Sequence, residues 1–226
     1  MKHTPLRTPS KSWGFGLLLL FLVTPLTLWA QSFKVSGFIK AEYLYDTRQV
    51  AAARDGEFHL FPLPKSEATE TDNLGAFVFF SRLSLTIGDL PEALGAQVTG
   101  YFESDFFGPQ NGLESTFRLR RAFVRLAWDQ AELLFGQEWS PLFTLAAFPR
   151  TVATTTGAPF QPFARQPQIR ATLKGQGVRF IGALAWQRDA FQDISFNGVS
   201  GIKQQQLSAL PALHTHLQLF SQGGSV

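Results

Sequence analysis

Basic side chains recur at alternate positions of several short segments, and this spacing is the most chemically suggestive feature of the sequence. Arg121 and Arg125 alternate with apolar residues, as do Arg170 and Lys174, and Arg179 follows the same rule. Residues two apart on an extended chain point to the same side, so each segment would present its charges on one face. A guanidinium group matches the geometry of a carboxylate, so a surface that gathers these side chains would attract small anions.

Two other groups of residues could do chemistry. His214 and His216 would share one face of a strand as a possible metal pair, but no third ligand has a clear place, and water-facing polar residues explain the spacing. Glu67, Glu70 and Asp72 lie in a long polar segment, where a solvated surface is the default and divalent-ion contact the alternative. No nucleophile elbow, phosphate loop or zinc-protease motif occurs, so we expect neither an enzyme nor a cofactor.

Composition narrows the class of protein further. The chain has 226 residues with 45% hydrophobic and 16% charged side chains, which argues against wholesale disorder. The absence of Cys excludes disulfides, thiolate metal sites and a cysteine nucleophile. The net charge of +3 comes from Lys2, Arg7 and Lys11, and the rest of the chain has 17 basic and 17 acidic side chains. A neutral chain without a basic-aromatic surface pattern gives no support for nucleic-acid binding.

Residues 1–30 have the order of a secretory signal peptide. A basic start is followed by an apolar stretch from Trp13 to Leu28 and by the small residue Ala30. Cleavage after Ala30 would leave 196 residues, and an uncleaved anchor helix is the alternative. No later window approaches the ~18 apolar residues of a membrane-spanning helix.

Beyond residue 31 the hydrophobic pattern has a period of two, which predicts β-strands with one apolar and one polar face. Eight such segments are expected, each near the ~9–11 residues that cross a bilayer as a tilted strand. They are 33–46, 76–87, 94–106, 117–128, 131–138, 168–174, 178–187 and 210–220.

The connections between these segments separate a membrane barrel from a soluble sandwich. Long connections at 47–75, 107–116, 139–167 and 188–209 alternate with short ones at 88–93, 129–130 and 175–177. Long loops on one side and short turns on the other are typical of outer-membrane β-barrels. The fold expected is therefore an all-β transmembrane antiparallel barrel, with a soluble barrel or sandwich as the alternative. Trp128 would lie at the inner rim and Tyr43, Tyr45 and Trp186 at the outer rim, as aromatic girdles.

Several short motifs carry a family resemblance over most of residues 33–190. The segments are Gly37–Asp46, Glu103–Gly108, Leu119–Phe123, Gly136–Pro141 and Arg165–Arg170. In this order they resemble the DcaP-like trimeric porins of Gram-negative outer membranes. The resemblance implies a homotrimer in outer-membrane lipid, a barrel of about sixteen strands, and diffusion of small, often anionic solutes such as carboxylates. It also implies that residues 139–167 form an inward-folding loop that narrows the pore.

The number of strands departs from that family. Eight strands are about half of what such a barrel needs, so we interpret residues 31–226 as the N-terminal half of a porin barrel, truncated or a fragment. A complete eight-stranded barrel is the alternative, since eight strands can close. Its interior would be filled with side chains, so it would act as an anchor or adhesin and would not conduct. A barrel enzyme is a further alternative class.

Charge is divided unevenly, with 6 basic and 12 acidic side chains in residues 31–117 but 10 basic and 3 acidic in residues 118–188. This favours an anion-attracting pore. Strand alternation places Arg82, Arg121, Arg125, Arg170, Lys174 and Arg179 toward the lumen, with Arg150 and Arg165 in the narrowing loop. The alternative role for each is structural, through pairing with Glu103, Asp105, Glu132 or Glu138. Alternation gives Arg118 and Arg120 the wrong parity for the lumen and predicts them at the outer rim or a subunit contact.

Overall fold

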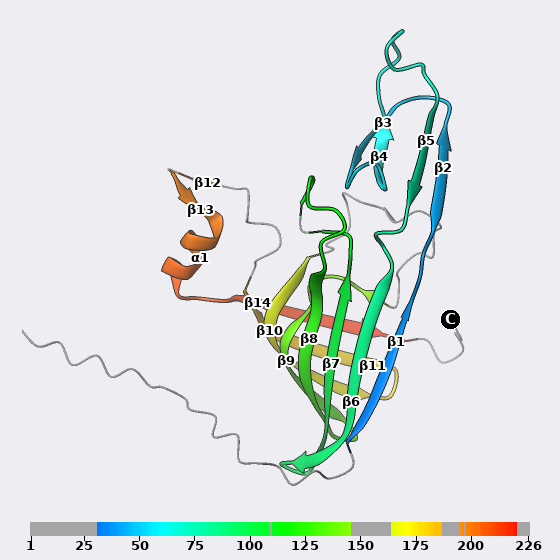
Figure 1. Ribbon diagram of the computed structural model, residues 1–226. Helices are drawn as coiled ribbons and strands as arrows, with labels where there is room; N and C mark the ends of the chain where they lie inside the picture. Colours follow the sequence, from blue (N-terminus) through cyan, green and yellow to red (C-terminus); the bar gives the residue numbers. More distant parts are fainter. Residues whose placement is uncertain (1–30, 109, 146–163, 187–194, 197, 221–226) are drawn as a thin grey trace, which may run out of the picture.

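The computed structural model describes residues 31–108, 110–145, 164–186, 195–196 and 198–220. Its main element is an eight-stranded sheet, called the wall below, with the order β1-β6-β7-β8-β9-β10-β11-β14 (Figure 1). The strands of the wall are β1 (Ser32–Phe38), β6 (Arg82–Ala93), β7 (Ala96–Asp105), β8 (Arg118–Ala127), β9 (Ala131–Trp139), β10 (Arg165–Gly175), β11 (Val178–Ala185) and β14 (Ala212–Leu219).

Every neighbouring pair in the wall is antiparallel, and long and short connections alternate along the chain. The expected all-β fold and its eight wall strands are therefore confirmed. The short connection predicted at residues 88–93 is wrong, because β6 continues through these residues and the turn lies at Leu94–Gly95. Register shifts after Ile87 and Leu90 let the strand extend there with an irregular ladder. We call the two ends of the wall the long-loop end and the short-turn end.

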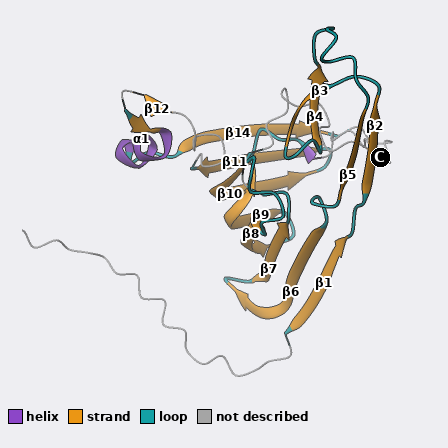
Figure 2. Cartoon of the chain, turned by 45° about the horizontal axis from the view of Figure 1, so that its top comes forward, coloured by secondary structure: helices purple, strands orange, loops and turns teal. Residues whose placement is uncertain are grey.

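The wall is an open, strongly curved sheet. Figure 2 shows it bending from β1 and β6 round to β11 and β14, and these two ends do not meet. Among the described residues β1 pairs only with β6 and β14 only with β11, so each edge strand has one free side.

The polarity of the wall is the reverse of that in a water-soluble sheet. Large apolar side chains on its outward face are exposed, including Val35, Leu173 and Leu217. The most completely buried large side chains are instead polar, Asp105 and Ser104. An apolar outer surface with polar groups inside is what a lipid-facing barrel requires.

The wall ends at a break in its first two strands. The sequence predicts continuous strands over 33–46 and 76–87, but residues 39–41 and 78–81 interrupt them. At the break the Ser81 hydroxyl bonds to the backbone of Lys40, accepting from its N–H at 3.0 Å and donating to its carbonyl oxygen at 3.4 Å. A side chain thus replaces the ladder bonds, which ends the regular pairing of β1 with β6.

Beyond this break lies a projecting region that we call the extension, residues 39–81. It contains one hairpin within another: β2 (Glu42–Asp46) pairs with β5 (Asn73–Phe77), and β3 (Val50–Ala53) pairs with β4 (Phe58–Pro62). Figure 1 shows the extension standing beyond the long-loop end of the wall. The expected loop 47–75 therefore contains β3, β4 and the first residues of β5.

A second addition lies between β11 and β14. It consists of β12 (Ser195–Phe196), β13 (Val199–Ser200) and α1 (Gly201–Ser208), which is capped by the Ser200 side chain. Within the described part of the chain, no helix has the length and apolar character needed to cross a membrane.

Candidate functional site

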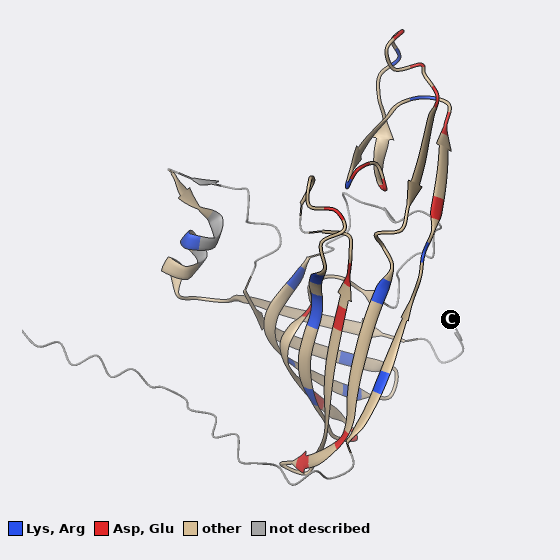
Figure 3. Cartoon of the chain, in the orientation of Figure 1, with Lys and Arg blue, Asp and Glu red and all other residues tan. Residues whose placement is uncertain are grey.

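The inner face of the wall carries a polar hollow formed by four adjacent strands, β8 to β11. Its volume is about 230 Å³. It is lined by Arg121, Phe123, Arg125, Glu132, Leu134, Glu138, Arg170, Thr172, Lys174, Arg179 and Ile181. Strand alternation thus brings together five of the predicted cations on one face, and Figure 3 shows basic residues recurring on these strands.

Next to this hollow, toward the long-loop end, a group of paired charges forms the loop-end cluster. It comprises Arg82, Glu103, Asp105, Arg118, Arg120, Arg121 and Glu138. At its centre the Arg120 guanidinium bridges two carboxylates, with Nε 2.8 Å from Glu103 Oε1 and Nη1 2.6 Å from Asp105 Oδ2. The Arg120 side chain is only 3% exposed, so these charges are buried and mutually compensated.

The other arginines of the loop-end cluster attach to the same acids. Arg118 holds Asp105 through two nitrogens, with Nε at 2.6 Å and Nη2 at 3.1 Å. Arg121 donates to both carboxylate oxygens of Glu138, from Nε at 2.7 Å and from Nη2 at 2.6 Å. Arg82 Nε lies 3.7 Å from Glu103. Such forked contacts fix both partners in place, so Glu103, Asp105 and Glu138 act as the structural partners expected from the sequence.

The predicted position of Arg118 and Arg120 is wrong. The register between β7 and β8 shifts after Glu103, which pairs with Arg121, whereas Ser104 pairs with Leu119. The extra residue in β8 is a β-bulge, and it reverses the parity of the residues before it. Arg118 and Arg120 therefore point to the inner face and bind Asp105. The charges of these two arginines are the sequence signal for an inward orientation. Outward placement would expose them to lipid, while two acids nearby would lack partners.

Toward the short-turn end the inner face has an excess of cations, which we call the turn-end basin: Arg125, Arg170, Lys174, Arg179 and the acid Glu132. Lys174 pairs with Glu132. Arg170 donates to Gln168 and to the Trp139 carbonyl oxygen, which are uncharged acceptors. Buried Nε atoms of Arg125 and Arg179 have no hydrogen-bond partner among the described residues. Guanidinium groups with unused donors are what an anion would bind.

The first residues of the expected narrowing loop turn onto the inner face. Ser140 N donates to Ala164 O at 2.8 Å, and His216 Nδ1 lies 3.1 Å from the Pro141 carbonyl oxygen across the sheet on β14. The predicted place of Arg165 in this loop is wrong, because Arg165 is the first residue of β10 and pairs with Trp139 at the end of β9. Its guanidinium lies over the Trp139 ring at 4.9 Å. Arg150 and residues 146–163, the greater part of the predicted loop, lie outside the described residues.

His214 and His216 do not form a metal site with other side chains in the described structure. His216 contacts Pro141, whereas His214 Nε2 has no hydrogen-bond partner there. The described residues contain no group of three His, Cys, Asp or Glu side chains placed to hold a metal ion.

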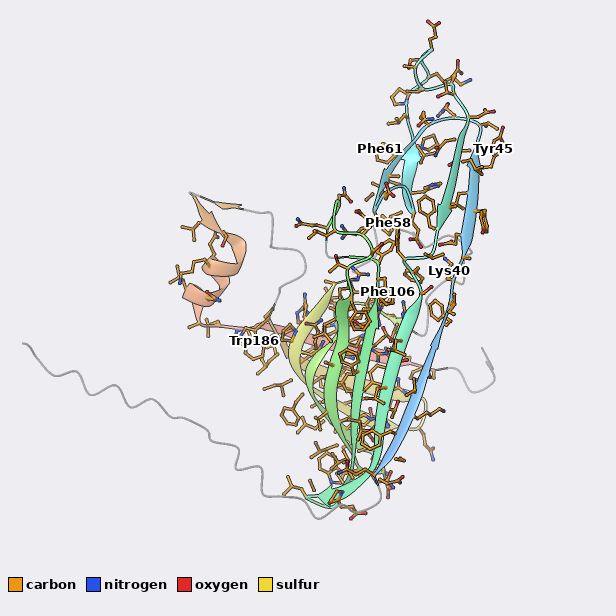
Figure 4. All side chains as sticks on the ribbon, in the orientation of Figure 1. Lys40, Tyr45, Phe58, Phe61, Phe106 and Trp186 are labelled. Carbon is orange, nitrogen blue, oxygen red and sulfur yellow. The ribbon has the colours of Figure 1, made fainter. Side chains whose placement is uncertain are left out.

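The four expected girdle aromatics lie in three places in the structure. Tyr43 and Tyr45 are exposed on β2 in the extension, and Tyr45 donates to Asp72 at 2.7 Å. Trp128 lies at the short-turn end, where its Nε1 donates to Leu94 O at 3.1 Å. Trp186 follows β11 at the long-loop end and is partly exposed (Figure 4). Tyr43 and Tyr45 thus lie beyond the break in the first predicted strand. A position of any of the four at a membrane boundary stays a prediction.

One structural comparison relates this arrangement to a solved protein. The chain is similar to the outer membrane channel DcaP of Acinetobacter baumannii, with a TM-score of 0.59 and 20% sequence identity. The match covers 85% of this chain and 50% of that channel, so the chain spans about half the length of the protein it resembles. At this identity the likeness establishes a porin-like fold for the wall. No protein-family model matches the sequence, and no curated protein matches it.

Proposed function

We propose that this chain forms part of the wall of an outer-membrane porin, through which small hydrophilic solutes diffuse passively with a preference for anions such as carboxylates. The porin-like fold and the apolar outward face support the membrane role. The observation that carries the anion preference is the turn-end basin, where four cations share one carboxylate and two buried guanidinium nitrogens lack partners.

The assembly and its location belong to the same proposal. Residues 1–30 would direct export of the chain to the outer membrane of a Gram-negative bacterium and be removed. The free edges of β1 and β14 would pair with further strands of the barrel, because an unpaired edge in lipid leaves backbone groups without hydrogen bonds. Subunits would associate as a homotrimer within outer-membrane lipid, as the resemblance to trimeric porins implies.

The proposal is tested by ion selectivity in planar bilayers under a salt gradient. We expect a reversal potential that indicates anion preference, because an excess of fixed positive charge raises the local concentration of anions. Arg125→Gln combined with Arg179→Gln should lower the anion-to-cation permeability ratio about two- to threefold. The control is Lys203→Gln, which removes a positive charge from α1, outside the wall.

Two outcomes would contradict this proposal in different ways. Cation preference in the unmodified protein would overturn the proposed anion selectivity. It would not contradict the proposal that the protein forms a channel. Complete lack of conductance from protein that forms a closed barrel in the membrane would instead support the alternative of a non-conducting anchor or adhesin.

A further inference from the structure

The tip of the β3–β4 hairpin, residues 54–57, is folded back from the extension toward the wall. Arg54, Asp55 and Gly56 all have positive φ angles, and the turn closes with Glu57 N donating to Arg54 O at 3.1 Å. Figure 4 shows Phe58, next to this tip, close to the junction where Lys40 leaves the wall. The hairpin therefore returns to the long-loop end of the wall and does not project freely.

The tip is held there by the loop between β7 and β8. Arg54 N donates to Asn111 Oδ1 at 2.9 Å, and the Arg54 guanidinium lies over the Phe107 ring at 5.8 Å. Phe58 meets Phe107 edge to face at 6.2 Å, and Phe107 meets Phe80 in the same way at 5.8 Å. A continuous aromatic contact thus connects the hairpin to the residues just above the loop-end cluster.

One acidic side chain is buried under this contact. Glu57 is 2% exposed, and the groups that act on its carboxylate are the Glu42 carboxylate, Lys40 and the Phe80 backbone N–H. Glu42, also buried, interacts with Glu57 and forms an ion pair with Lys40 at 2.6 Å. Two carboxyl groups thus lie together beside one ammonium group, so ionisation of both carboxyl groups would place two negative charges side by side in a buried position.

Other charged groups surround this trio on every element packed against it. The hairpin contributes Arg54, Asp55 and His59, and β6 contributes Arg82 beside Phe80. The β7–β8 loop and the strand ends that flank it contribute Asp105, Glu114 and Arg118. Asp105 and Arg118 bind each other, and His59 lies 3.7 Å from Asp46. The charged groups that act on the Glu57 carboxylate itself are Glu42 and Lys40.

We propose that the β3–β4 hairpin is a proton-dependent cover at the mouth of the pore, docked while Glu57 holds a proton beside Glu42 and released when both carboxylates are ionised. This inference rests on the proposed function only in taking the long-loop end of the wall as the mouth of a pore. The docking equilibrium itself is a property of residues 40–58, 80, 106–108 and 110–117.

The direction of the pH dependence follows from the environment of Glu57. Burial first, and then the neighbouring Glu42 carboxylate, raises the pKa of Glu57 to about 8, while Lys40 and the Phe80 backbone N–H act in the opposite direction. A released hairpin would expose Glu57 to water and return its pKa to the ordinary range of a carboxyl group. The docked form thus binds the proton more tightly, so docking is favoured at low pH and weakens as the pH rises toward about 8.

The test measures the distance between the hairpin and the β7–β8 loop in the full chain in liposomes. Because the sequence has no Cys, spin labels can be attached at Asp55→Cys and Leu113→Cys alone, both at exposed positions. Pulsed electron spin resonance should give one short distance at pH 6. A longer-distance population should increase about tenfold or more relative to the short one between pH 6 and pH 9.

Two further variants make the result specific. Glu57→Gln keeps the shape of the protonated side chain and should remain docked at both pH values, because the amide does not ionise. Glu67→Gln, a matched change at an exposed position of the same extension, should retain the shift of the unmodified chain. A distance that does not change with pH in the unmodified chain would overturn the proposal, as would a shift that persists in Glu57→Gln. Since no current is measured, either result is independent of the bilayer test of pore function.

Discussion

The loop-end cluster and the turn-end basin use the same residue types on the same inner face, yet their arginines are placed for different tasks. In the loop-end cluster Arg120 is 3% exposed and lies between two carboxylates. In the turn-end basin four cations lie with the one carboxylate of Glu132, so the charge excess is positive. The first group holds strands and loops in place, and we expect the second to attract anions through its excess of positive charge.

This difference matters for any argument based on counting charges in a pore. An arginine that is bidentate to a buried carboxylate contributes little net charge to the lumen, whereas one bound to uncharged acceptors contributes most of its charge. Arg121 and Arg125 are four residues apart on one strand but fall on opposite sides of this division. Selectivity is therefore expected to depend on the turn-end basin, and stability on the loop-end cluster.

The largest effect should follow from Arg120→Ala. Removing this guanidinium leaves Glu103 and Asp105 buried with less compensation, and breaking a buried pair typically costs about 3–5 kcal/mol. The free energy of unfolding, measured by urea titration in lipid or detergent, should fall by that order. Arg125→Ala, on the same strand, is the control and should change it by less than about 1 kcal/mol. Equal losses in both variants would abolish the distinction between the two groups.

A smaller effect is expected from Arg121→Lys, which retains the charge. Lysine cannot reproduce the forked contact with Glu138, and it loses the stacking of the guanidinium on Tyr101 at 4.6 Å. We expect a loss of about 1–2 kcal/mol in the same urea titration. Arg125→Lys provides the matched comparison and should be close to neutral; an unchanged Arg121→Lys would show that charge alone matters in the loop-end cluster.

The smallest effect on stability should come from Lys174→Met in the turn-end basin. Its pair with Glu132 is partly exposed, and such ion pairs contribute about 0–1 kcal/mol. The unfolding midpoint should hardly move, while the reversal potential shifts toward cations because one lumen charge is lost. A loss comparable to that of Arg120→Ala would place Lys174 among the structural charges.

The sequence predicts the wall well because a lipid-facing strand is constrained at every second residue. Phe180 and Leu184 must face outward and Arg179 inward, and the observed exposures follow this alternation. The alternation of long and short connections also predicts the antiparallel order, since neighbouring strands can be joined by turns as short as Leu94–Gly95. The strands of the wall and their antiparallel order depend on the local hydrophobic pattern, so the sequence predicts them.

The local sequence pattern does not predict features that depend on contacts between residues far apart in the chain. The bulge before Arg121 has no local signal, because alternation alone predicts opposite faces for Arg118 and Glu103. The break at Lys40 depends on a hydroxyl 41 residues further along the chain, so the pattern of residues 33–46 continues across it unchanged. Burial of Glu57 is equally invisible, since an acid in a polar loop is normally solvated.

The Lys40–Ser81 connection also has an evolutionary consequence. Below it, seven residue pairs from Ser32–Gly88 to Phe38–Arg82 fix the register of β1 against β6. Insertions or deletions between β2 and β5 therefore change the length of the extension without sliding these strands and turning their lipid-facing residues inward. The extension can therefore vary in length while the wall keeps its alignment.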